Sequence, residues 1–166
     1  MGGAIDASGF QDSDGSRYIV YKVDGNSLAG GGPCGNGGII KRPTPLVLAK
    51  VGPDGLTPAG RPVQLLDRTE RDGPLVEAPN LAKLSDGSYA LFYSSNCWNS
   101  ENYDISWARA TSINGPYTRM YTLLRSGMFD LKSPGGASVA SDGKHMVFHA
   151  NHNGGRAMFA SQIRIV

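Results

Sequence analysis

The sequence has few features of a nucleic-acid-binding or membrane-bound protein. Its 16 basic and 14 acidic residues are nearly balanced, and neither sign forms a run, which argues against a nucleic-acid partner and an anionic membrane surface. No stretch reaches the roughly 18 apolar residues of a membrane-spanning helix. The first ten residues, MGGAIDASGF, lack the basic start and apolar stretch of a signal peptide. We therefore expect no nucleic acid, no membrane and no export signal in this chain.

Cysteine is also scarce, with only Cys34 and Cys97 in the sequence. The two residues are far apart and have neither a C-x-x-C nor a Cys/His metal spacing. Each lies in a loop-like context, GGPCGNGG or SSNCWNS. We expect two free thiols, with a Cys34–Cys97 disulfide as the alternative in an oxidising compartment.

The chain lacks the apolar spacing of amphipathic helices. No segment of about a dozen residues has apolar positions at i, i+3, i+4 and i+7 without an interrupting Gly or Pro. The 23 glycines and 10 prolines instead separate short strings rich in β-branched and aromatic residues, which is typical of strands joined by turns. The predicted strands are residues 16–23, 44–51, 63–67, 88–95, 103–110, 121–124, 144–151 and 156–166. The sequence therefore predicts an all-β chain.

Three Asp-Gly turns divide the chain into repeats. The repeated strings are DSDGSRYIVYKVDGN from residue 12, LSDGSYALFYSSN from residue 84 and ASDGKHMVFHANHN from residue 140. Each Asp-Gly predicts a hairpin with a type I′ turn, because both residues tolerate a positive φ. The incoming arms of these hairpins begin at residues 4, 75 and 131.

Repeated units of four antiparallel strands build the blades of a β-propeller. The sequence accounts for about three four-stranded blades, whereas closed propellers have about four to eight. Because the first strand of each blade lines the central channel, we expect Asp6 and Glu77, at equivalent starts of consecutive blades, to converge on one pocket. A solvated loop is the alternative position for Glu77, since most glutamates are exposed.

Four segments of the chain resemble glycoside hydrolase family 43. They are IDASGFQDSDGSRYIVYK, PLVEAPNLAKLSDGSYALFYSS, SINGPYT and MVFHAN, in this order. The family's members are five-bladed propellers that act on arabinose- and xylose-containing polysaccharides, as arabinofuranosidases, arabinanases or xylosidases. The resemblance implies an incomplete propeller, in which residues 1–166 are the C-terminal part, approximately blades 3 to 5, without the N-terminal blades. It also implies a secreted protein.

The same resemblance implies the roles of two carboxyl groups. Glu77, in the xEAP strand, is the general acid of an inverting hydrolase, and Asp6, in the IDxSxF strand, raises the pKa of Glu77 and orients it. An inverting mechanism also needs a general base about 6.5–9.5 Å from the acid. The family's base lies in the first blade and has no matching position in this sequence. The alternative is a truncated, inactive propeller that only binds carbohydrate.

The resemblance implies three further contacts in the channel. His149 contacts a metal ion or an ordered water, and a half-buried histidine that bonds to backbone is the alternative. No cofactor is required, and a structural calcium ion is the metal in question. Arg156 reaches the substrate, with a solvated arginine as the alternative.

Aromatic residues are candidate sugar contacts, because aromatic faces suit sugar rings. Phe10 is a candidate beside the sugar, with core packing as the alternative. Trp98 and Tyr103 flank a loop that is expected at the channel mouth, where exposed aromatics would form a platform for substrate. Finally, the uncovered faces of the outer blades predict self-association.

Overall fold

The computed structural model describes residues 2–165 and confirms the all-β prediction: these residues form eleven strands and no α-helix. The first sheet consists of β1 (Ala4–Gln11), β2 (Arg17–Val23), β3 (Leu46–Val51) and β4 (Val63–Leu66). The second consists of β5 (Val76–Lys83), β6 (Tyr89–Ser95), β7 (Asp104–Ala110) and β8 (Thr118–Leu124). The third consists of β9 (Gly135–Val139), β10 (His145–His152) and β11 (Gly155–Gln162).

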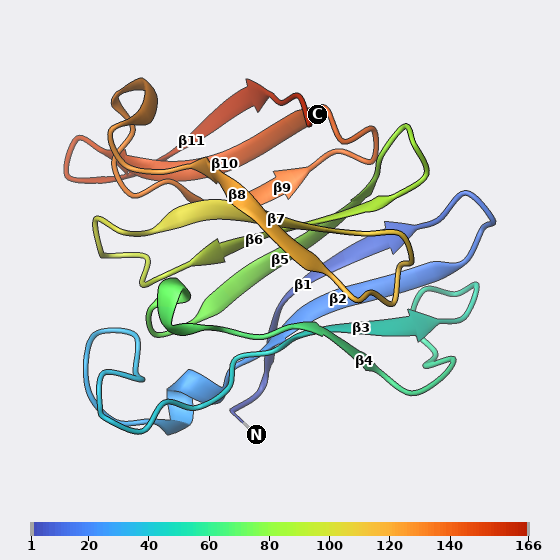
Figure 1. Ribbon diagram of the computed structural model, residues 1–166, viewed down its shortest axis with the longest axis horizontal. Helices are drawn as coiled ribbons and strands as arrows, with labels where there is room; N and C mark the ends of the chain where they lie inside the picture. Colours follow the sequence, from blue (N-terminus) through green and yellow to red (C-terminus); the bar gives the residue numbers. More distant parts are fainter. Residues whose placement is uncertain (1, 166) are drawn as a thin grey trace.

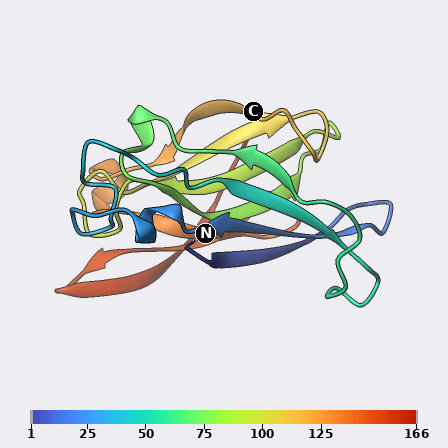
Figure 2. The same cartoon turned by 90° about the horizontal axis from the view of Figure 1, so that it is seen from below.

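The three sheets lie side by side as successive blades of a β-propeller (Figure 1). Within each sheet the strand order follows the chain, and all neighbouring strands are antiparallel. The first strand of the second blade, β5, contacts β1 on one side and β9 on the other, across the blade boundaries. Figure 2 shows β1 and the β10–β11 hairpin on one side of the molecule and β8 on the other.

Two details of the predicted blades differ in the structure. Within residues 2–165 the third blade has three strands instead of four, and β11 ends at Gln162 instead of residue 166.

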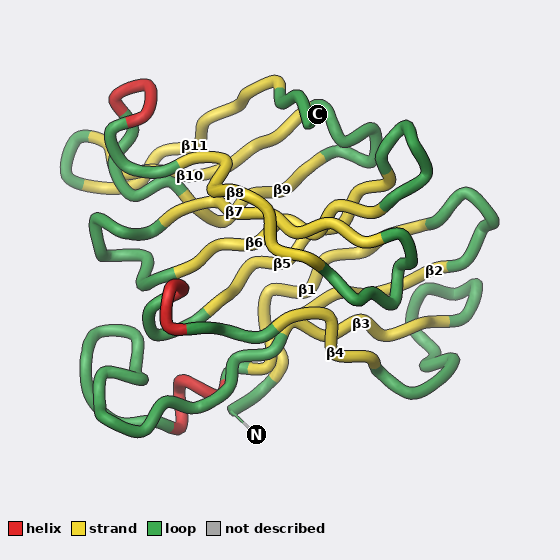
Figure 3. The backbone as a smooth tube through the Cα atoms, viewed as in Figure 1, coloured by secondary structure: helices red, strands yellow, loops and turns green. Residues whose placement is uncertain are grey.

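Three short 3₁₀ helices also occur, η1 (Gly25–Leu28), η2 (Glu70–Asp72) and η3 (Met128–Asp130). The long connection from β2 to β3 is loop apart from η1 (Figure 3). No helix in the described part of the chain could span a membrane.

The Asp-Gly hairpins form, but their turns are not of type I′. In the second blade, Gly87 N–H donates to Leu84 O at 2.9 Å, and Leu84 N–H donates to Ser88 O at 2.8 Å. Gly87 has a φ of 84°, whereas Asp86 does not have a positive φ, so this is a longer loop that ends in a left-handed glycine. The Asp86 carboxylate accepts the Ser88 N–H at 3.0 Å, and the equivalent contact recurs at the other two turns. The aspartate therefore serves as a hydrogen-bond acceptor.

The hydrophobic core lies between the blades in two layers. One layer joins the first and second blades and includes Leu46, Leu48 and Leu91. The other joins the second and third blades and includes Phe92, Trp107 and Phe148. Because side chains alternate across a strand, the consecutive residues Leu91 and Phe92 of β6 enter different layers. Every residue of β6 is buried, so the second blade is covered on both faces.

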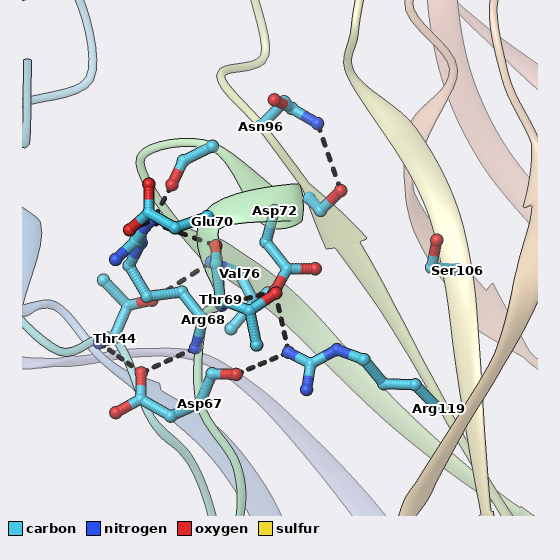
Figure 4. Close-up of polar contacts among 12 residues, drawn as sticks. Thr44, Asp67, Arg68, Thr69, Glu70, Asp72, Val76, Asn96, Ser106 and Arg119 are labelled. Atoms are coloured by element: carbon cyan, nitrogen blue, oxygen red, sulfur yellow. Dashed lines mark hydrogen bonds and ion pairs between the residues drawn. The ribbon is translucent and has the colours of Figure 1, made fainter.

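Polar contacts from the loops before β3 and after β4 anchor the start of β5 (Figure 4). The Val76 N–H donates to the Thr44 hydroxyl at 3.1 Å, and the Thr44 N–H donates to Asp67 Oδ1 at 2.8 Å. Arg119 of β8 donates to the carbonyl of Asp67 and, at 2.7 Å, to the carboxylate of Asp72. The first and second blades are therefore tied together one residue before Glu77.

We expect Thr44→Val to lower the free energy of unfolding by about 1–3 kcal/mol, because it leaves the buried Val76 N–H without its acceptor while the shape of the side chain is kept. Urea unfolding measures the change. Thr118→Val, at an exposed position of β8, is the control. Equal effects of the two substitutions would show that the Thr44 hydroxyl does not anchor β5.

Candidate active site

The three inner strands share one irregularity near their beginnings. The register with the neighbouring strand shifts between residues 5 and 8 of β1, between residues 77 and 80 of β5, and between residues 135 and 138 of β9. In each case the inner strand has one residue more than its partner, which is a β-bulge. Bulges re-aim side chains and leave one residue unpaired in its own sheet, and these three lie at the same place in each blade.

The bulge places one residue of each inner strand in the left-handed region. These residues are Asp6 (φ 56°), Ala78 (φ 51°) and Gly136 (φ 61°). Two of them use their N–H groups to contact the preceding blade: Ala78 donates to Asp6 Oδ2 at 3.0 Å, and Gly136 donates to Ser94 Oγ at 2.8 Å. The bulges therefore provide hydrogen bonds between blades as well as the shape of the inner wall.

Asp6 and Glu77 are not at equivalent positions, contrary to the expectation from the sequence. The strand registers align Glu77 with Ile5, and Asp6 with Ala78. The offset is one residue, and because of the bulge both side chains still face the same cavity.

A cavity of about 450 Å³ lies where the inner strands converge. It is lined by residues 6–8 of β1, 77–80 of β5 and 136–138 of β9, and by Trp98, Tyr103, His149 and Arg156. Six of the seven candidate residues are therefore brought together here, all except Phe10: Asp6, Glu77, Trp98, Tyr103, His149 and Arg156. Asp6 and Glu77 are the two carboxylates of this lining.

Glu77 is held in a mostly dry position by two neighbours. The Tyr103 hydroxyl donates to Oε1 at 2.8 Å, and Lys22 Nζ lies 3.5 Å from Oε2. Burial raises the pKa of Glu77 above its ordinary value of 4.5, the Lys22 charge and the Tyr103 hydrogen bond oppose this rise, and the Asp6 charge adds to it. Burial therefore contributes more than Asp6, the group that the sequence singled out.

The Tyr103 ring is itself fixed by the third blade. The Tyr103 ring stacks on the imidazole of His149, with 6.1 Å between the two ring centroids. The Arg156 guanidinium lies 5.5 Å from the centroid of the Tyr103 ring. A Cβ atom at Gly135 would overlap with the Tyr103 ring, and one at Gly136 would overlap with the His149 ring. The two glycines therefore allow β9 to approach both side chains closely.

His149 accepts a hydrogen bond from Arg156 at Nδ1. Burial and the Arg156 charge lower the pKa of His149, so the ring is neutral at pH 7 and Nε2 carries the proton. A protonated Nε2 donates hydrogen bonds but does not coordinate a cation. The described residues contain no group of three His, Cys, Asp or Glu that could hold a metal. They do not fit a directly bound cation, and contact between His149 and calcium through water stays a prediction.

Arg156 uses its guanidinium to join several backbone segments. It donates to Asn151 Oδ1 at 2.7 Å, to the Ser133 carbonyl at 2.7 Å, to the His149 carbonyl at 3.1 Å and to the Trp98 carbonyl at 3.3 Å, besides His149 Nδ1. A guanidinium has five N–H donors, so all of them have protein partners. Arg156 lines the cavity, but a hydrogen bond to substrate would replace one of these contacts.

The aromatic candidates divide between the core and the cavity. Phe10 is 9% exposed and packs edge-on against Tyr89 in the core between the first two blades, so its assignment beside the sugar is wrong. It lies at the far end of β1, away from the bulge. Trp98 is 52% exposed and lines the cavity, whereas Tyr103 is 2% exposed. The predicted platform therefore contains Trp98 without Tyr103, whose hydroxyl contacts Glu77.

Two residues of the site were missed in the sequence. Lys22 is 1% exposed and pairs with Asp24 at 3.0 Å as well as with Glu77. It lies two residues after the buried Val20, on the inward side of β2, and a lysine in that register was the available signal. Asn80 donates to Ser8 Oγ at 2.7 Å and accepts the N–H of Val139 at 3.1 Å. It joins all three blades, and no local pattern marked it.

Cys34 and Cys97 form a disulfide, with 5.7 Å between their Cα atoms, so the expectation of two free thiols is wrong. The bond joins the β2–β3 loop of the first blade to the loop after β6, and Trp98 is the next residue. The sequence separation of 63 residues gave no local indication of this proximity.

Comparisons with known proteins agree with this architecture. The family model "Glycosyl hydrolases family 43" matches residues 1–165. A thermostable family-43 glycoside hydrolase has 25% sequence identity and a TM-score of 0.80, over 98% of this chain and 55% of its own. No protein with a curated description matches.

Two solved structures from Bacteroides thetaiotaomicron share the fold. An endo-1,4-β-xylanase has 21% identity and a TM-score of 0.76, over 98% of this chain and 55% of its own. An endo-arabinase has 18% identity and a TM-score of 0.74, over 98% of this chain and 57% of its own. The chain thus spans little more than half the length of each of these proteins.

We expect the pKa of Glu77, followed by NMR of its ¹³C-labelled carboxyl, to lie above 4.5. Tyr103→Phe should raise it further, because the hydroxyl stabilises the carboxylate, and Asp6→Asn should lower it, because a nearby negative charge is removed. Glu101→Gln, at an exposed loop position, is the control that should leave it unchanged. Shifts of the same sign in the two site variants would contradict these electrostatics.

Proposed function

The chain belongs to glycosyl hydrolases family 43, and we propose that it hydrolyses O-glycosidic bonds in arabinose- or xylose-containing polysaccharides or oligosaccharides, with Glu77 as general acid. The observation that carries this proposal is a mostly buried carboxyl group at a cavity, with a raised pKa and a hydrogen bond from Tyr103 to one oxygen. A general acid must be protonated before the bond breaks and must lie at the leaving oxygen. Burial shifts the pKa of Glu77 upward, which favours the protonated form, and the side chain lines the cavity; both observations support this proposal.

The surroundings of Glu77 suit the release of a proton. Tyr103 donates to Oε1 at 2.8 Å and Lys22 to Oε2 at 3.5 Å. We place the proton of the acid on Oε2, the oxygen with the longer contact. As the glycosidic bond breaks, this proton passes to the leaving oxygen and Glu77 becomes a carboxylate. The carboxylate is then stabilised by the Tyr103 hydrogen bond and by the Lys22 ammonium, 3.5 Å from Oε2. The site therefore disfavours early ionisation by burial and supports the charge that develops during the reaction.

Asp6 is proposed as the pKa modulator of this acid. Its charge raises the pKa of Glu77, and its Oδ2 accepts the N–H of Ala78, the residue after the acid. The second contact fixes the backbone from which the Glu77 side chain extends. Asp6 thus acts on Glu77 through charge and through position.

An inverting mechanism needs a base that activates water across the sugar, about 6.5–9.5 Å from the acid. Asp6 is committed to the Ala78 N–H on the same wall as Glu77. We propose that the base comes from a segment outside residues 2–165 or from a second copy of the chain. We propose that these steps require no cofactor.

The disulfide bears on where the protein works. Disulfides persist in oxidising compartments and are rare in the cytosol, and the structure has one between Cys34 and Cys97. We therefore propose that the chain acts outside the cell, as a secreted enzyme on plant polysaccharides.

The alternative function is carbohydrate binding without catalysis. The observation that favours it is the lining of the cavity itself, in which Asp6 and Glu77 are the two carboxylates that residues 2–165 supply. The exposed Trp98 would serve as a sugar platform under either function.

We expect Glu77→Gln to lower kcat/KM on linear arabinan or xylotriose by about 10²–10⁴-fold, the usual contribution of a general acid. The loss should be smaller on p-nitrophenyl α-L-arabinofuranoside or β-D-xyloside, because p-nitrophenolate leaves without needing a proton. Glu101→Gln is the matched control, since that side chain is exposed. Equal losses on both substrate types would exclude Glu77 as the acid, and sugar binding without hydrolysis by the unmodified chain would favour the alternative function.

We also propose self-association through the open face of the third blade, where Val147 is 42% and Met158 is 79% exposed. Adjacent apolar side chains on an uncovered sheet favour association. Sedimentation velocity should show a species larger than the monomer, and Val147→Lys with Met158→Lys should convert it to the monomer. Met120→Lys, on β8, is the control. A monomeric, cooperatively unfolding parent chain would exclude this association.

A further inference from the structure

Lys22 and Asp24 form an ion pair directly beside the proposed acid. The Lys22 side chain is 1% exposed, and its Nζ lies 3.0 Å from Asp24 Oδ1 and 3.5 Å from Glu77 Oε2. Two carboxylates therefore share one buried ammonium, and Asp24 has the closer contact. Asp24 has no part in the steps proposed above, although it stands at one end of this chain of charges.

The backbone around Asp24 leaves its carboxylate available to Lys22. Asp24 is the N-cap residue of η1, a position where an aspartate side chain usually accepts an N–H of the first turn. In the described chain the Asp24 side chain makes no such bond. The backbone is instead held by its neighbours, since the Asp24 N–H donates to the Gly3 carbonyl at 3.0 Å and the Asp24 carbonyl accepts the Ser27 hydroxyl at 2.8 Å. The Asp24 carboxylate is thus turned to Lys22.

A buried ammonium needs a counter-charge, because it has lost most of its hydration. Asp24 supplies that charge to Lys22 whether Glu77 is protonated or ionised. Without Asp24, Glu77 would be the remaining carboxylate within ion-pair distance of Lys22 among residues 2–165, and the ammonium would stabilise its ionised form. A carboxyl group that is ionised before the bond breaks has no proton to donate.

We propose that Asp24 is a positioning residue of the site, which holds the Lys22 ammonium on its own carboxylate and thereby keeps Glu77 protonated until the glycosidic bond breaks. This inference rests on the proposed function, and it adds a residue that acts on the acid through Lys22. When Glu77 gives up its proton, the ammonium is already 3.5 Å from Oε2, where it is shared between the two carboxylates.

The other charged and titratable groups around Glu77 leave this role to Lys22. They are Asp6 from β1, Tyr103 from the loop before β7 and, against the Tyr103 ring, His149 from β10 and Arg156 from β11. Burial raises the pKa of Glu77 most, and Lys22 is the strongest of the influences that oppose this rise. The position of the Lys22 ammonium therefore has a direct effect on the acid.

The test follows the ¹³C-labelled carboxyl of Glu77 by NMR in the full chain. Asp24→Asn keeps the shape of the side chain and removes its charge, so the pKa of Glu77 should fall, because Lys22 is left with Glu77 as its counter-charge. Asp24→Ser removes the same charge with a residue that suits an N-cap, and should have the same effect. Asp130→Asn, at an exposed position of η3, is the control that should leave the pKa unchanged.

A double variant separates action through Lys22 from direct repulsion between the carboxylates. Lys22→Met alone should raise the pKa of Glu77, because a nearby cation is removed. If Asp24 acted by direct repulsion, Asp24→Asn would shift the pKa of Glu77 equally with and without Lys22. If Asp24 holds Lys22, the shift should be clearly smaller in the Lys22→Met background. The indole N–H of the fully buried Trp107 reports whether each variant keeps its fold.

The pH dependence of hydrolysis gives a second measurement. On linear arabinan or xylotriose, Asp24→Asn should move the alkaline limb of the kcat/KM profile to lower pH by about one unit, which is about a tenfold loss on that limb. At pH values below the limb, kcat/KM should equal that of the parent chain. A residue with a purely structural role would lower kcat/KM at every pH.

The outcomes separate this inference from the proposed function. An unchanged or raised pKa of Glu77 in Asp24→Asn and Asp24→Ser would overturn the role of Asp24, and so would equal shifts with and without Lys22. Neither result bears on the proposed function, which depends on the loss of hydrolysis in Glu77→Gln. The expected pKa shifts in a chain that hydrolyses no substrate would support the link from Asp24 to Glu77 and overturn the proposed function.

Discussion

A bulge repeated in the inner strand of each blade is the constraint on which the site depends. An extra residue in β1, β5 and β9 is left unpaired within its own sheet. The N–H groups thereby released bond across the blade boundaries, from Ala78 to Asp6 and from Gly136 to Ser94. The same bulge turns the side chains beside it toward the shared cavity. Regular pairing would send alternate side chains of these strands into the interblade core, and the cavity would lose its polar wall.

The surroundings of Glu77 are assembled from three blades, each with a different contribution. The first blade supplies Lys22 and Asp6, the charges that act on Glu77 in opposite directions. The second supplies Glu77 itself and Tyr103, which is bonded to it. The third blade contributes His149, against which Tyr103 stacks. Because burial outweighs the stabilising contacts in its effect on the pKa of Glu77, tight packing of the blades itself raises the pKa of this carboxyl group.

Most of the fold was predictable because its signals are local. Short apolar strings, which form the strands, alternate with turns along the chain. Because the Asp-Gly turns repeat once per blade, the strands could be assigned to blades from the sequence. The turn type was wrong because the aspartates bond to the backbone two residues further on, as Asp86 does to Ser88, a use of the side chain that the Asp-Gly pair alone does not distinguish. Phe10 was misplaced because an aromatic residue suits a sugar face and a core equally well.

The sequence by itself determined the all-β class and the blade repeat, because each rests on a spacing within a short segment. The convergence of Asp6, Glu77, Trp98, His149 and Arg156 on one cavity was expected from the blade repeat together with the resemblance to the family. Only the tertiary structure decided the one-residue offset between Asp6 and Glu77, the burial of Lys22 and Tyr103, and the bond between Cys34 and Cys97. These depend on contacts between residues that are far apart along the chain. Register shifts, desolvation and disulfide pairing are set by the packing of one blade against the next, and no local pattern encodes that packing.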